Sequence, residues 1–153
     1  MGFLFTNTII EVYTLGNKIE DSLIAAGWAG FSEADMDQLA RRTELSDEQK
    51  RDVYLNKTAA EELCLEYIRK NLKLDSGNRP TGESYIPCKN EPVEILEITV
   101  LNPDDLPGIC SKGASIGRTT IHIVVRIPVD VAFLGRRHLE KHVDVDVKAF
   151  YKN

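Results

Sequence analysis

Two histidines and two aspartates lie close together near the end of the 153-residue chain. His138 and His142 are four residues apart, and Asp144 and Asp146 follow at intervals of two. On a helix, the two imidazoles would share a face and could bind a metal ion together. On a strand, His142 and the two aspartates would share a solvent-exposed face. The sequence favours the strand, because the alternating positions 143, 145 and 147 are all valine. A surface cation site remains the less favoured alternative.

Nucleophilic residues are present, but their spacing does not assemble them into a site. Cys110, Ser111 and Ser115 lie in one long loop, and His122 lies on a predicted strand. No GxSxG motif accompanies them, and "GASIG" is not followed by the GK[ST] of a phosphate-binding loop. The sequence therefore predicts no catalytic residue and no cofactor, and it favours a protein that is not an enzyme.

The chain has three cysteines, Cys64, Cys88 and Cys110. Cys64 falls in a helical pattern and is expected to be a buried small hydrophobe. Cys88 and Cys110 fall in loops on either side of a predicted strand, so they could form a disulfide in an oxidising compartment. Such a bridge would close a loop of about 22 residues and contribute about 3 kcal/mol. Two free thiols are the alternative, and the odd cysteine count leaves both open.

The charge of the chain argues against nucleic acid as a partner. The formal net charge is -5 and the pI is about 5.2, whereas nucleic-acid binders present a basic face. The densest basic group, Arg136, Arg137 and Lys141, is predicted to be a solvent-exposed turn. No apolar run approaches the ~18–20 residues that a membrane-spanning helix needs.

The first half of the chain has helical periodicity. Apolar or small residues recur every three or four positions and define one helix face: Ile9, Val12, Gly16, Ile19, Leu23, Ala26 and Gly30. The glycines and alanines around Trp28 are expected where another part of the backbone approaches closely. Ser32 and Asp35 predict a short second helix through Met36, Leu39 and Ala40. The capping box of Ser46 and Gln49 predicts a longer helix through Val53 to Leu72.

The second half has the alternation of strands. Residues 93–101 predict a strand with Leu96, Ile98 and Val100 on one face. Two further alternating runs, 120–131 and 142–151, predict an antiparallel pair with odd positions buried and even positions, His122 among them, facing solvent. Pro128 cannot donate to a ladder, so its end of the strand is expected at an edge or a bulge.

These elements predict an α+β fold in which N-terminal helices, one of them long, pack on a small antiparallel sheet of three to four strands. The chain is interpreted as a single domain, 1–153. Its helical part spans 1–74, a loop rich in glycine, proline and serine spans 75–92, and the β part spans 93–153.

Three stretches in this order carry a family resemblance. They are "NKIEDSLIAAGWAGF" (17–31), "TAAEELCLEYIRKNLKLD" (58–75) and the final "IHIVVRIPVDVAFLG…HVDVDVKAF" (121–150). Together they resemble the soluble part of TadE-like pseudopilins, the minor pilins of tight-adherence pilus systems. The apolar N-terminal anchor of that family and its cleavage site are absent from these 153 residues, so the chain is expected to be an ectodomain without its anchor.

The resemblance implies a pilin-like fold and a non-enzymatic part in an extracytoplasmic pilus or pseudopilus. It implies no cofactor. Other pilin subunits or assembly proteins, or further copies of this chain, would be the partners, and the membrane would be reached only through an anchor. The candidate subunit contacts are Ile9, Val12, Trp28 and Phe150, the last because it breaks the alternation of the final strand.

Two other functions stay open. The chain could be a cytosolic or phage-encoded structural or adaptor protein, which predicts reduced Cys88 and Cys110 and a stable oligomer. It could also be a small enzyme or binder that uses a metal held by His138, His142, Asp144 and Asp146. This third hypothesis predicts stoichiometric metal in the purified protein.

Overall fold

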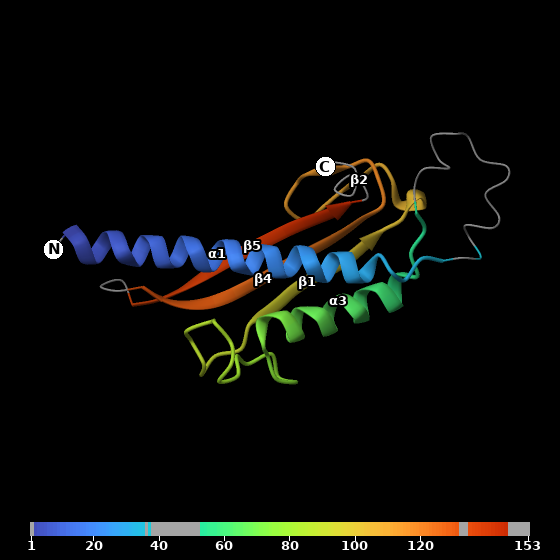
Figure 1. The fold of residues 1–153 in the computed structure, drawn as a ribbon. Helices are drawn as coiled ribbons and strands as arrows, with labels where there is room; N and C mark the ends of the chain where they lie inside the picture. Colours follow the sequence, from blue (N-terminus) through green and yellow to red (C-terminus); the bar gives the residue numbers. More distant parts are fainter. Residues whose placement is uncertain (1, 36, 38–52, 132–134, 147–153) are drawn as a thin grey trace, which may run out of the picture.

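Two helices pack on one face of a three-stranded antiparallel sheet (Figure 1). The computed structural model describes residues 2–35, 37, 53–131 and 135–146, with side chains from residue 10 onward. The helices are α1 (Gly2–Gly30) and α3 (Lys57–Leu72), and the sheet has the strand order β1 (Glu94–Leu101), β4 (Thr120–Val131), β5 (Gly135–Asp146). Between β1 and β4 lie a short 3-10 helix, η3 (Pro103–Asp105), and a two-stranded sheet of β2 (Gly108–Ile109) and β3 (Ser115–Ile116). The predicted α+β class is confirmed.

The predicted apolar face of α1 is its buried face. Gly16, Ile19, Leu23, Ala26 and Gly30 are all buried. Their spacing of three or four residues keeps them on one side of the helix, and this side packs on β5, β4 and α3. α1 ends where its last carbonyls are used by the following residues, since the amides of Phe31 and Ser32 donate to the carbonyls of Gly27 and Ala29.

Two glycines let α1 approach its neighbours closely. A Cβ atom at Gly27 would lie 2.5 Å from Val145 Cγ2, and one at Gly30 would lie 2.5 Å from Cys64 Sγ and 2.8 Å from Ile121 Cδ1. Real Cβ atoms do not come so close, so only glycine fits without a shift at either position. The expectation of close approach in this part of the chain is confirmed.

The second described helix starts later than the sequence predicts. α3 begins at Lys57, where the side chain of Asn56 accepts a hydrogen bond from the Ala59 amide and caps the helix. Val53 therefore precedes the helix and is not part of it. Ser46 and Gln49, like the predicted helix through Met36, Leu39 and Ala40, lie outside the described residues.

The end of α3 is as predicted. The helix stops at Leu72, and Lys73 adopts the left-handed conformation with φ 54°, so that the chain turns into the loop at 75–92.

β4 is the central strand, and the predicted antiparallel pairing is confirmed. Ile121 pairs with Val145 of β5 and with Val100 of β1, and Ile123 pairs with Val143 and Ile98, so these two odd positions of β4 meet apolar partners on both sides. β1 stops pairing at Arg126, so within the described part of the chain Pro128 has β5 as its one strand neighbour. A residue without an N–H is tolerated there, as expected for an edge.

β5 starts earlier than predicted, and residues 147–151 of the predicted run lie outside the described residues. It starts at Gly135, so Arg136 and Arg137 belong to a strand, and the prediction of a turn for this basic group is wrong. The guanidinium of Arg136 binds the carboxylates of Asp130 and Glu91. These ion pairs place charge on the free edge of β5, where charged side chains discourage pairing with another sheet.

A β-bulge in β1 overturns one predicted side-chain direction. Ile95 pairs with Val125 and Glu97 pairs with Val124, so Leu96 is an extra residue between them. Leu96 is 42% exposed and does not share the buried face with Ile98 and Val100. One inserted residue changes the alternation, and Ile95 takes the core position instead.

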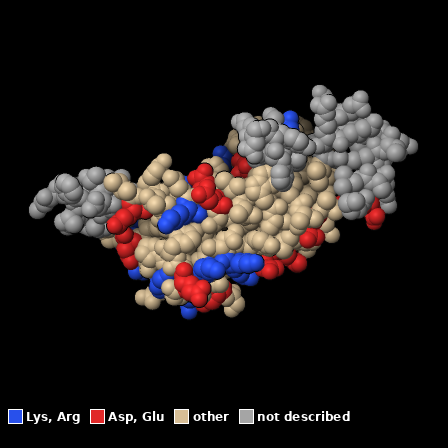
Figure 2. Space-filling view, viewed as in Figure 1, with Lys and Arg blue, Asp and Glu red and all other residues tan. Residues whose placement is uncertain are grey.

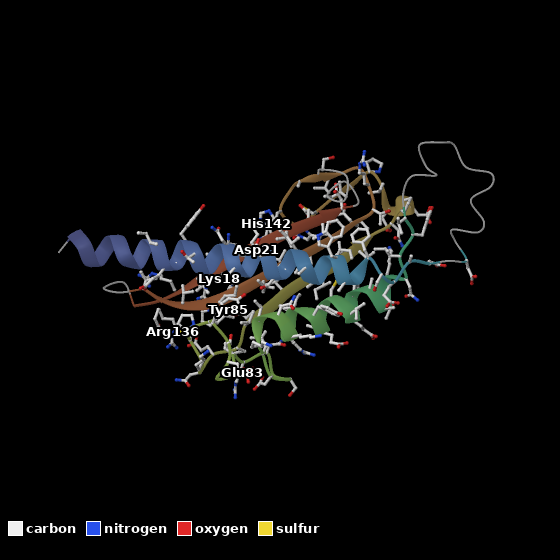
Figure 3. The ribbon with its side chains drawn as sticks, viewed as in Figure 1. Lys18, Asp21, Glu83, Tyr85, Arg136 and His142 are labelled. Carbon is white, nitrogen blue, oxygen red and sulfur yellow. The ribbon has the colours of Figure 1, made fainter. Side chains whose placement is uncertain are left out.

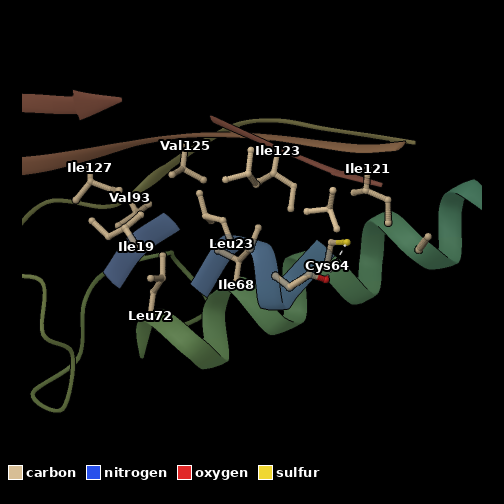
Figure 4. Packing of buried hydrophobic residues seen from close by; sticks show 14 of the residues in the cluster. Ile19, Leu23, Cys64, Ile68, Leu72, Val93, Ile121, Ile123, Val125 and Ile127 are labelled. Carbon is tan, nitrogen blue, oxygen red and sulfur yellow. Dashed lines mark hydrogen bonds between the residues drawn. The ribbon is translucent and has the colours of Figure 1, made fainter. Parts of the chain in front are cut away.

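The core lies between the helices and the odd face of the sheet (Figure 4). Ile19 and Leu23 of α1 and Ile68 of α3 are fully buried against the β4 side chains Ile123 and Ile127. One continuous cluster of buried residues thus joins the helical part and the β part. Neither described helix combines the length and the apolar composition needed to span a membrane.

Candidate functional site

α1 continues past the sheet at its N-terminal end (Figure 1). Ile10 and Tyr13 lie in the N-terminal half of α1 and are exposed over 56% and 69% of their surface. They are three residues apart, so they lie on neighbouring turns of one helix face. Large apolar side chains that are exposed together on one helix face are suited to packing against another protein.

The C-terminal half of α1 has an uncharged surface. No charged residue occurs from Ser22 to Ser32, and Figure 2 shows a broad area without charged side chains over this half of the helix. Ala25 is exposed and Trp28 is half-buried, with its ring 5.7 Å from that of Phe31.

The four predicted subunit contacts fall on different parts of the chain. Val12 and Trp28 are both half-buried on α1. The side chain of Ile9 and all of Phe150 lie outside the described residues. Their role in subunit packing therefore stays a prediction, and Ile10 and Tyr13, which the buried stripe does not include, join the candidate surface.

Tyr85 fixes the 75–92 loop beneath α1 (Figure 3). Its hydroxyl lies 2.9 Å from Ser22 Oγ and donates to the Lys18 carbonyl at 3.2 Å, and the Lys18 ammonium lies 6.0 Å from the ring. Burial raises the pKa of Tyr85 above its usual value. This loop thereby supports the middle of α1, next to the exposed part of the helix.

A second group of functional side chains surrounds His122 on the opposite face of the sheet. β4 contributes His122, whose cross-strand neighbours are Thr99 on β1 and Asp144 on β5. Glu97 follows on β1, and Cys110 comes from the loop between β2 and β3. His122 is 1% exposed, so the expectation that even positions of β4 face solvent is wrong here. The loop from Asn102 to Thr119 covers this part of the strand.

The imidazole of His122 has a partner at each nitrogen. Nδ1 lies 2.5 Å from a carboxylate oxygen of Asp144, and Nε2 lies 3.1 Å from Ser111 Oγ. Glu97 Oε2 is 3.8 Å from Nε2. The ring is therefore held between two carboxylates, one near each nitrogen.

Serine, histidine and aspartate thus stand in the order of a nucleophile, a base and its orienting acid. Ser111 Oγ lies 3.1 Å from His122 Nε2, and a hydrogen bond from Ser111 is also the largest cause of the lowered pKa of Glu97, with burial opposing it. The single hydroxyl is thus within reach of both His122 and Glu97.

Cys110 completes the group. One donor atom each from Cys110, His122 and Asp144 lies within 4.8 Å of the others, and Cys110 is 7% exposed. Sequence reasoning treated Cys110 and His122 as unrelated. A signal was present in Val124, an apolar residue at an even position, which indicates that both faces of β4 are covered.

The metal ligands considered from sequence do not form one group. His138 and His142 are exposed on β5, and the structure pairs them with Pro128 and Val124 of β4. Of the four candidates, only Asp144 belongs to the group of metal-binding residue types that the described part of the chain brings together. The His142 ring lies 6.3 Å from that of His122, beside the group rather than in it.

The disulfide considered between Cys88 and Cys110 is not formed, and all three cysteines are free. Cys88 donates to Asp130 and Cys110 lies beside His122, eight residues away along the same strand. Eight residues of strand span about 26 Å, whereas the Cα atoms of a disulfide lie within about 7 Å. Burial is the largest cause that raises the pKa of the Cys88 thiol.

No protein-family model, curated protein or solved structure matches the chain. The resemblance to TadE-like pseudopilins consequently remains an inference from the residues, and the function is argued from the two candidate sites.

Proposed function

We propose that this chain is a non-enzymatic structural component of an extracytoplasmic pilus or pseudopilus, and that it acts by packing α1 against neighbouring subunits. The main support for this proposal is the exposure of Ile10 and Tyr13 on the N-terminal half of α1. The uncharged surface from Ser22 to Ser32 supports it, because it continues the same helix without a charge that packing would have to desolvate.

The energetics of such packing are favourable at these positions. Burying one large apolar side chain contributes about 1.5–3 kcal/mol, and Ile10 and Tyr13 are more than half exposed. Repetition along an assembly would bury them in every subunit. The other subunits would be further copies of this chain or related pilins, and the packing of α1 itself would use no cofactor.

Crosslinking in the cells that produce the protein tests this proposal. A photoreactive amino acid at Tyr13 should give adducts with another subunit in the extracytoplasmic fraction. The matched control is the same amino acid at Glu66, an exposed residue of α3. An Ile10→Glu variant should lose the Tyr13 adducts while its thermal unfolding stays unchanged, since Ile10 is exposed.

Two results would count against the proposal. Equal adducts from positions 13 and 66 would indicate nonspecific contact. A protein that remains entirely in the cytosol, with specific Tyr13 adducts, would favour the adaptor alternative and would separate the packing surface from the proposed compartment.

A further inference from the structure

The group around His122 contains three kinds of metal-binding side chain brought together by the fold. Cys110 comes from the loop between β2 and β3, His122 from β4 and Asp144 from β5. Their donor atoms lie within 4.8 Å of one another, and His122 and Cys110 are more than nine-tenths buried. Asp144 is 28% exposed, which leaves a route from solvent to the group.

The Cys110 thiol differs from the other two cysteine thiols in its hydrogen bonding. Within the described part of the chain, Cys64 donates to the Ala26 carbonyl and Cys88 donates to Asp130. No such bond from the Cys110 sulfur occurs among those residues. A buried sulfur next to an imidazole and a carboxylate is an unused donor atom directed at two further metal ligands.

We propose that Cys110, His122 and Asp144 bind one divalent transition-metal ion, and that Zn²⁺ is the ion that fits this set. A thiolate with an imidazole and a carboxylate combines soft and hard donors, which suits Zn²⁺ better than Mg²⁺ or Ca²⁺. The thiolate and the carboxylate together balance the charge of the ion. Glu97 lies 3.8 Å from Nε2, the ring nitrogen opposite the one that Asp144 contacts, and it is not part of this ligand set.

Metal binding requires a local rearrangement that the side chains can make. Donor atoms of a tetrahedral zinc site are about 3.3–3.8 Å apart, given bond lengths of about 2.0–2.3 Å. The Nδ1–Oδ1 separation of 2.5 Å must widen or the ring must present Nε2 to the ion, with Asp144 then reoriented. Ser111, which is exposed, can release Nε2 by changing its rotamer.

The ion would attach the β2–β3 hairpin to the sheet. This hairpin has only two residue pairs, Gly108 with Ile116 and Ile109 with Ser115, and an isolated pair of such short strands is barely stable in water. A metal bond to Cys110, the residue after β2, would fix the hairpin over His122. The role inferred for the ion is therefore structural and is independent of the packing of α1.

The test uses the purified full chain, kept reduced and free of chelator. Elemental analysis should find one Zn²⁺ per chain, and after its removal Zn²⁺ at 100 times its Kd should raise Tm by about 5–10 °C. Co²⁺ in its place should give a thiolate-to-metal charge-transfer band. Cys110→Ser should remove the band and weaken binding at least tenfold, and Asp144→Asn should also weaken it.

Cys88→Ser is the matched control, because Cys88 is a buried thiol next to a carboxylate but without a histidine. It should keep the band and the affinity. The proposal is overturned if the wild-type chain binds neither ion, or if the band survives in Cys110→Ser. Because these measurements need no assembly, their failure would leave the proposed packing function standing.

Discussion

The contact between α1 and β5 yields a sharp test at Gly27. Replacing Gly27 by alanine places a methyl group 2.5 Å from Val145 Cγ2 and 2.9 Å from Val145 Cβ. Both separations are far inside van der Waals contact, and Val145 is 2% exposed and held in the core. The helix or the strand must therefore shift to accommodate the methyl group.

The expected cost of Gly27→Ala follows from two opposing terms. Overpacking a well-filled core costs about 1–3 kcal/mol, and the short separations here place the value toward the upper end. Alanine in place of glycine within a helix recovers about 1 kcal/mol. The net loss of unfolding free energy is then about 1–2 kcal/mol, which lowers Tm by about 3–6 °C for a chain of this size.

A double-mutant cycle tests whether the contact with Val145 causes the destabilisation by Gly27→Ala. Val145→Ala alone leaves a cavity and is destabilising, but with Gly27→Ala the new methyl group fills part of that cavity. The double variant should be more stable than the sum of the two single effects by about 1 kcal/mol or more, measured by urea unfolding. Gly82→Ala is the control, since no atom lies within 4 Å of its Cβ position, and it should be neutral or slightly stabilising. Additive effects of Gly27→Ala and Val145→Ala would refute the close contact.

Three further predictions concern side chains that make hydrogen bonds. Asn102→Ala should cost about 2–3 kcal/mol in urea unfolding, because its buried amide both donates to the carbonyl and accepts from the amide of Leu55; an unchanged midpoint would contradict this. Asn56→Ala should lower the unfolding free energy by about 1 kcal/mol, because the α3 cap is lost. Asn56→Asp should retain most of the capping stabilisation, because its carboxylate also accepts a hydrogen bond. The folded-state pKa values of Glu97 and Asp105 are lowered, mainly by hydrogen bonds from Ser111 and Lys57. Their stabilisation is therefore present above the unfolded pKa of about 4 and is lost as pH falls through the lower folded values. Unfolding midpoints should drop below about pH 4, and Glu97→Gln should reduce that drop.

The helical half and the strand pairing could be predicted because each rests on a local repeat. The stripe through Ile19 and Leu23 has the helix period, and the alternation around Ile123 and Val143 has the strand period. In both cases the buried side follows from the side-chain directions of one element alone. The start of α3 was missed because Asn56, a residue with the capping ability of Ser46, lies further along the chain and provides the observed cap.

The alternation of residues along the strands could not predict which side chains are covered by a loop that packs on the outer face of the sheet. A strand pattern distinguishes two faces, but it does not show whether a loop returns to cover the polar one. His122 and Thr120 have the parity of solvent-facing residues and are nonetheless buried, because the segment after η3 folds back over them. The bulge at Leu96 has a similar origin, since the register of β1 is fixed by its pairing with β4 and not by its own sequence. The Cys110 group was unpredictable for the same reason: its members become neighbours only after the loop has closed.

The two candidate sites lie on opposite faces of the sheet, and this separation has a measurable consequence. α1 packs on the odd face through Gly27 and Val145, whereas His122 and Asp144 belong to the even face. A change at Cys110 should therefore leave the α1 surface intact. Crosslinking from Tyr13 in a Cys110→Ser chain should match the wild type, while the Co²⁺ band disappears. If the adducts were lost as well, the β2–β3 hairpin would be part of the packing surface, and the two sites would have to be treated as one.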